Sequence, residues 1–75
     1  MNMNKLKGKI VENGMTMQQL AHKMDVNPGT LYRKISKQPE SFTTKQVYQI
    51  VMILDLNYQD TMDIFFDPDL TVKWP

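Results

Sequence analysis

Hydrophobic residues recur every three or four positions along most of this chain, the spacing that places side chains on one face of an α-helix. The strongest such stripe consists of Val47, Ile50, Val51 and Leu54. A second stripe with the same spacing consists of Met17, Leu20, Ala21 and Met24. Shorter stripes are formed by Leu6, Ile10 and Val11 and by Tyr58, Met62 and Phe65. The pattern predicts a first helix over about residues 4–13, a fourth from residue 43 and a fifth over about 57–66, with two more between the first and the fourth.

Helix-capping residues stand at the ends of these predicted helices. Two capping boxes, in which the side chains of the N-cap and of the third helical residue bond to each other's backbone, are formed by Thr16 with Gln19 and by Thr43 with Gln46. Glycine at residue 14 is a typical helix stop. The fold class that follows is all-α: a compact bundle of about five short helices in one domain of residues 1–66.

The last nine residues, 67–75, follow a different pattern. Leu70, Val72 and Trp74 alternate with polar residues, as in a strand with one buried face. We interpret this C-terminal tail as a dimerisation arm that pairs with a second copy. Two alternatives stay open: a tail that folds back so that Trp74 covers the core, and a frayed terminus. Ile64 and Phe66 are expected to contribute to the same dimer interface.

The most informative stretch, residues 16–35, reads TMQQLAHKMDVNPGTLYRKI. It predicts two short helices joined by a tight turn, because Asp25 interrupts the apolar stripe and Asn27-Pro28 starts a new helix with an N-cap and a proline at its first position. In the second helix Leu31 and Ile35 share the inward face, whereas Gly29, Arg33 and Lys37 point away from it.

This stretch resembles the helix-turn-helix of the phage repressor and Cro family (lambda repressor-like, XRE-type) of DNA-binding regulators. The residues that carry the resemblance are Leu20-Ala21, Met24, Val26, Thr30-Leu31 and Tyr32-Arg33-Lys34-Ile35. The resemblance covers about residues 5–66 and implies that the second helix enters a major groove of double-stranded DNA. The family usually has glycine in a left-handed conformation where Asp25 stands, and often a phosphate-binding glutamine where Met17 stands.

The DNA-binding residues expected on this basis fall into two groups. Those at the reading helix are Asn27, Pro28, Gly29, Thr30, Tyr32 and Arg33, and those that would hold phosphates are Gln18, Lys34, Lys37 and Lys45. The planar fork of Arg33 suits O6 and N7 of guanine, and Gly29 lets the backbone approach the DNA. Asn27 is equally well explained as a plain N-cap, and Tyr32 as packing against the following loop.

The net charge of +1 conceals a division along the chain. Residues 1–45 hold eight basic and three acidic side chains, a net charge of +5, whereas residues 46–75 hold one lysine and five aspartates, a net charge of −4. We interpret Asp60, Asp63 and Asp67 as an acidic, solvated face of the fifth helix, and Lys5 and Lys9 as outward residues of the first. A basic half that contains the helix-turn-helix would orient the molecule on a polyanion.

Other function classes receive little support from the sequence. The chain has no cysteine and a single histidine, His22, so no nucleophilic or metal-binding constellation is apparent, and neither an enzyme nor a cofactor is expected. No apolar run approaches the ~20 residues of a membrane span, and the first residues are too polar for a signal peptide, so we expect a cytoplasmic protein.

Two functions remain in contention. The first is a phage- or prophage-type transcriptional regulator that binds a palindromic operator in double-stranded DNA as a homodimer. The alternative is a protein-interaction module on the same fold, such as an anti-repressor, with weak or no DNA binding. The alternative is favoured by Pro28 and Gly29 at the reading edge and by Met17 in place of glutamine. It is also favoured by the acidic C-terminal half, which would serve as a surface for a protein partner.

Overall fold

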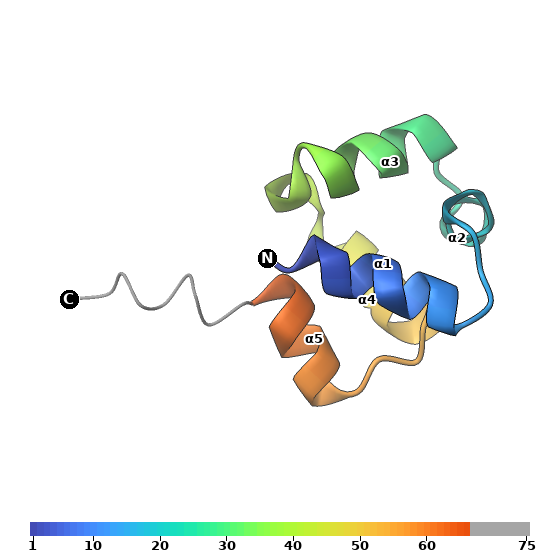
Figure 1. Ribbon diagram of the computed structural model, residues 1–75. Helices are drawn as coiled ribbons and strands as arrows, with labels where there is room; N and C mark the ends of the chain where they lie inside the picture. Colours follow the sequence, from blue (N-terminus) through green and yellow to red (C-terminus); the bar gives the residue numbers. More distant parts are fainter. Residues whose placement is uncertain (67–75) are drawn as a thin grey trace.

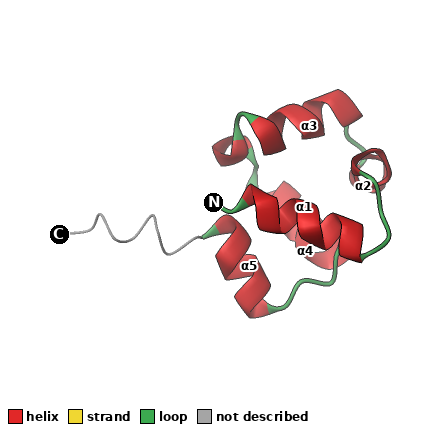
Figure 2. Ribbon diagram, in the orientation of Figure 1, coloured by secondary structure: helices red, strands yellow, loops and turns green. Residues whose placement is uncertain are grey.

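The computed structural model of the protein describes residues 1–66. Its elements are α1 (Met3–Glu12), α2 (Met17–Met24), α3 (Pro28–Ser36), the single 3-10 turn η1 (Pro39–Ser41), α4 (Thr44–Ile53) and α5 (Tyr58–Phe65). Within these residues the protein has five α-helices and no strand, so the prediction of a small all-α bundle is confirmed. Figure 2 shows that short loops connect the helices. The predicted dimerisation arm lies outside the described residues.

Helix α1 crosses the middle of the bundle in Figure 1, with α4 behind it and α5 beside it. Helix α2 packs against both α3 and α4, and α1 packs against α5. In the same view α2 is seen nearly end-on while α3 lies across the picture, so the two helices cross steeply. No helix within the described residues is long and apolar enough to cross a membrane.

The core takes one large, fully buried side chain from each α-helix. These five residues are Leu6, Leu20, Leu31, Ile50 and Ile64. Ile10, Ala21, Met24, Ile35, Leu54, Leu56 and Phe65 complete the buried cluster. Removal of this apolar surface from water is the main force that holds five short helices together, because helices of eight to ten residues are marginal on their own.

The predicted caps begin the helices as expected. Thr16 Oγ1 accepts a hydrogen bond from the Gln19 backbone N–H at 3.1 Å, and the Thr16 N–H donates to Gln19 Oε1 at 2.9 Å. The second capping box, of Thr43 and Gln46, has corresponding distances of 3.1 and 3.0 Å. Gly14, with φ of 70°, follows the end of α1. Sequence reasoning missed the cap of α1, where Asn2 Oδ1 accepts from the Lys5 N–H at 3.0 Å.

The predicted orientation of α5 was right for Phe65, which is buried, and wrong at two other positions. Ile64, expected in a dimer interface, is fully buried, whereas Tyr58, expected on the same face as the buried Phe65, is 78% exposed. The reason is tertiary: the Asn2 N–H donates to the Ile64 carbonyl at 2.8 Å, and Asp60, one turn before Ile64, faces α1. These contacts turn the Asp60 and Ile64 side of α5 inward.

One smaller expectation was also wrong. Val11 is 73% exposed and does not join the inward face of α1, because Ile10 alone reaches the core at that end. After Ser36, the last residue of α3, the chain forms the 3-10 turn from Pro39. That turn is closed by hydrogen bonds to the Gln38 and Pro39 carbonyls.

Candidate nucleic-acid interface

The turn between α2 and α3 fixes how α3 is presented. Asp25 adopts the left-handed conformation expected of it, with φ of 59° and ψ of 42°. The Val26 N–H then donates to the Ala21 carbonyl at 3.0 Å, and the Val26 side chain packs against the core cluster. Ala21, on the helix that packs against α3, is fully buried.

Asn27 caps the start of α3. Its Oδ1 accepts a hydrogen bond from the Gly29 N–H at 2.8 Å, so the N-cap interpretation is confirmed. A Cβ atom on Gly29 would lie only 3.1 Å from this same oxygen. The cap therefore explains, without reference to DNA, why a glycine stands at position 29. Pro28, Gly29 and Asn27 are all exposed, and Thr30 is half-buried.

The two sides of α3 differ sharply in burial. Leu31 and Ile35 are 1% and 2% exposed and anchor the helix to the bundle. Arg33 and Lys37 are exposed on the other side, as predicted. Tyr32 is 60% exposed, so most of its surface faces solvent rather than the following loop. Helix α3 thus presents the guanidinium of Arg33 and the phenol of Tyr32 to solvent, with the ammonium of Lys37 directly after its last residue, while Leu31 and Ile35 are fixed in the core.

Lys34 is placed differently from the other cations of α3. Its Nζ donates to the backbone carbonyl of Ser41 at 2.9 Å and lies 3.1 Å from Ser41 Oγ. The same ammonium lies 5.8 Å from the centre of the Phe42 ring. The sequence carried no signal for this contact, because Ser41 is brought back to α3 only by the 3-10 turn.

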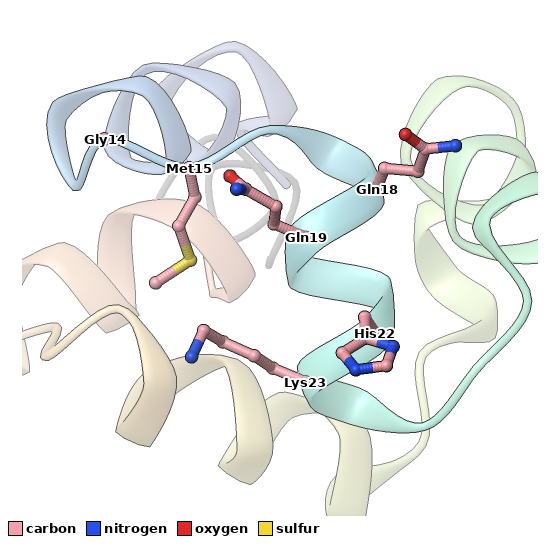
Figure 3. A pocket seen from close by; sticks show the side chains of 6 residues that line it. All are labelled: Gly14, Met15, Gln18, Gln19, His22 and Lys23. Atoms are coloured by element: carbon pink, nitrogen blue, oxygen red, sulfur yellow. The ribbon is translucent and has the colours of Figure 1, made fainter.

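The remaining predicted phosphate contacts, Gln18 and Lys45, lie at the starts of α2 and α4 and are both exposed. Gln18 also borders a surface cavity of about 380 Å³ whose other lining residues are Gly14, Met15, Gln19, His22 and Lys23. Figure 3 shows Gln18 on the opposite side of α2 from Met15 and Lys23. The cavity contains no residue of α3, so it is separate from the exposed face of that helix.

Ion pairs between α1 and α5 change the expected charge division. Lys5 Nζ lies 2.6 Å from Asp63 Oδ2 and 3.3 Å from Asp60 Oδ1, and Lys9 Nζ lies 3.2 Å from Asp60 Oδ2. The interpretation of Asp60 and Asp63 as a solvated acidic face was therefore wrong, since their side chains are only 16% and 29% exposed. Lys5 and Lys9 are likewise directed at α5 instead of solvent.

These contacts shift the pKa values of both partners. The hydrogen bond from Lys5, with a further one from Gln59, lowers the pKa of Asp63 below its ordinary value of 3.8. Partial burial alone would raise the pKa of Asp60, but the hydrogen bonds from Lys9 and Lys5 together outweigh it and lower that pKa.

The exposed cations Arg33 and Lys37, in contrast, form no ion pair within residues 1–66. Arg33 thus places unpaired positive charge on α3, and Lys37 places it directly after the helix.

Comparison of the chain with known protein families, characterised proteins and solved structures finds no match.

Proposed function

We propose that the protein is a sequence-specific DNA-binding transcriptional regulator of the phage or prophage type, Cro-like or repressor-like, that acts in the cytoplasm and reads an operator with α3. The observation that carries this proposal is the exposed face of α3, where Arg33 and Lys37 are unpaired within the described residues while Leu31 and Ile35 fix the helix from behind. An exposed helix that presents cations and is supported by a second helix across a short turn is suited to a major groove.

The proposed contacts divide into base reading and phosphate binding. Arg33 donates to O6 and N7 of a guanine through two parallel N–H groups, and Tyr32 offers its ring to a thymine methyl group or its hydroxyl to a phosphate. Gln18, Lys37 and Lys45 hold phosphates and set the register without reading sequence. Asn27 serves first as the cap of α3 and offers its remaining amide N–H groups to the DNA.

The proposed partner is double-stranded DNA, bound by a homodimer. Selection of bound sequences from a random duplex pool with the purified protein tests both points. We expect an inverted repeat whose half-sites are about one helical turn apart. Enrichment of a single half-site would favour a monomer, and no enrichment at low salt would refute the proposal.

Two substitutions on α3 then separate the proposed roles. We expect Arg33→Ala to cost about 1–3 kcal/mol of specific binding and to relax discrimination at one base position. Lys37→Ala should weaken binding to all duplexes about equally and lower the salt dependence of binding. Unchanged operator affinity of the Arg33→Ala variant would refute the assignment of Arg33 as a base-reading residue.

The second candidate function is a protein-interaction module on the same bundle. It is favoured by the outer face of α4, where Tyr48 and Met52, one turn apart, are 64% and 62% exposed. The pairing of Asp60 and Asp63 with lysines of α1 leaves less acidic surface for such a partner than the sequence suggested. Failure to bind any duplex at low salt, together with co-purification of a defined protein, would favour this function.

A further inference from the structure

Arg33 and Lys34 of α3, and Lys37 directly after the helix, are three cations within five positions, but within residues 1–66 only Lys34 has an internal partner. The ammonium of Lys34 donates to the Ser41 carbonyl at 2.9 Å and contacts Ser41 Oγ at 3.1 Å. That hydroxyl donates to the Gln38 carbonyl at 2.7 Å. Lys34 is half-buried, whereas Arg33 and Lys37 are exposed. The three cations therefore have different environments.

The contact of Lys34 leads from α3 through Phe42 to α5. Its ammonium lies 5.8 Å from the centre of the Phe42 ring, a distance at which a cation is attracted to an aromatic face. The Phe42 ring in turn meets Phe65 of α5 edge to face, with ring centres 6.0 Å apart. Lys34, Ser41 and Phe42 thus join the end of α3 to the 3-10 turn, to the start of α4 and to α5.

We infer that Lys34 is a positioning residue for DNA recognition and not a phosphate contact: it holds the C-terminal half of α3 against the 38–42 segment and so sets where Arg33 and Lys37 meet the DNA. This inference rests on the proposed function. An ammonium has three N–H donors, and two of the acceptors within reach of Lys34 belong to Ser41. Release of these bonds to reach a phosphate would remove the side-chain link between α3 and Ser41.

The test compares Lys34→Met with Lys37→Met, a matched pair in which each variant removes one positive charge at the C-terminal end of α3 and retains a long side chain. Affinity is measured against salt concentration for the selected operator and for a scrambled duplex of equal length. Each phosphate contact contributes about 0.9 to the slope of log K against log salt. We expect Lys37→Met to lower the slope by about one and to weaken both duplexes alike.

For Lys34→Met we expect the slope to be unchanged, binding to the scrambled duplex to be retained, and operator affinity to fall several-fold. A merely structural role would not separate the two duplexes in this way, and thermal melting checks that the variant is folded. A slope lowered by about one, with equal loss on both duplexes, would overturn the inference while the proposed function stands. Failure of the unaltered protein to bind any duplex would instead refute the proposed function.

A measurement on the unaltered protein covers the case in which Lys34→Met does not fold. The side-chain ammonium resonances of Lys34 and Lys37 are compared by nuclear magnetic resonance with and without the operator duplex. We expect the Lys34 ammonium to be protected from solvent exchange in the free protein and nearly unshifted by DNA, and the Lys37 ammonium to shift. A large shift of the Lys34 ammonium on addition of DNA would overturn the inference.

Discussion

The ammonium of Lys5 lies 2.6 Å from a carboxylate oxygen of Asp63, across 58 positions of sequence, and joins the first helix to the last. Asp60, between Lys5 and Lys9, extends this contact into a cluster of alternating charges. In this cluster Lys5 and Lys9 of α1 neutralise the two aspartates of α5. Arg33 and Lys37, at a distance in sequence from both helices, form no ion pair within residues 1–66.

Replacement of Asp60 by asparagine should therefore loosen α5. We expect Asp60→Asn to lower the melting temperature at neutral pH and low salt, because Lys5 and Lys9 both lose a charged partner. The difference should shrink at high salt, since these groups are partly exposed. Asp55→Asn is the matched control: Asp55 has φ of 51°, a conformation that asparagine also tolerates, and forms no ion pair within residues 1–66. Equal melting temperatures of the two variants would contradict this role.

The pH dependence of stability follows from the same contacts. The pKa values of Asp60 and Asp63 are lowered in the folded protein. The contribution of these two carboxylates to the free energy of unfolding is therefore present above the ordinary pKa of 3.8 and is lost as the pH falls through their lower folded pKa values. The hydrogen bond from Lys5 to Asp63 and that from Lys9 to Asp60 raise the pKa values of the two lysines above 10.5. The contribution of the two lysines to the free energy of unfolding is present below pH 10.5 and is lost as the pH rises through their folded pKa values. Thermal melts across pH should show the Asp60→Asn difference as a plateau between these limits, and a difference that does not decrease as the pH falls below 3.8 would contradict it.

Two glycines with equally open surroundings should respond oppositely to alanine. Gly8 lies inside α1, and Gly14 follows that helix with φ of 70°; neither has an atom within 4 Å of an added Cβ. Gly8→Ala should raise the free energy of unfolding by about 0.5–1 kcal/mol, because alanine is the better helix former. Gly14→Ala should lower it by about 1–2 kcal/mol, because a left-handed conformation is strained for alanine. Denaturant titration measures both, and equal signs would contradict the assigned conformations.

Asp25 occupies the left-handed position of the turn that presents α3. Asp25→Ala should lower the free energy of unfolding by about 1 kcal/mol, whereas Asp25→Gly should leave it unchanged or raise it by up to about 1 kcal/mol. Both variants remove the same charge, so their difference isolates the backbone conformation. Chemical denaturation that gives the two variants the same stability would show that the turn does not require this conformation.

Asn27 allows the cap of α3 to be separated from DNA binding. Asn27→Asp retains the oxygen that accepts from the Gly29 N–H and places a negative charge at a helix N-terminus, so the stability should be kept. Duplex affinity should fall, because the new carboxylate repels phosphates. Asn27→Ala should instead cost about 1 kcal/mol of stability. Thermal melts and duplex titrations on both variants provide the comparison, and unchanged duplex affinity of Asn27→Asp would place Asn27 away from the DNA.

What the sequence determined by itself is the local structure. The capping boxes at Thr16 and Thr43, the stop at Gly14 and the left-handed Asp25 depend on contacts within about four residues, which the order of residues specifies directly. The apolar stripes specified the inward faces of α2 and α3 in the same way. The face of α3 that carries Arg33 and Lys37 was predictable because Leu31 and Ile35 leave only one orientation.

Only the tertiary structure decided how distant segments share their contacts. Tyr58 and Ile64 are both apolar and lie on different sides of α5, so periodicity could not tell which one faces the core; contact with α1 selects Ile64. The pairing of Lys5 with Asp63 and of Lys34 with Ser41 likewise requires that the chain first be folded back. A sequence specifies the contacts of one helical turn through its spacing, but the choice among many possible long-range partners depends on which of them the packed core brings within a few ångströms.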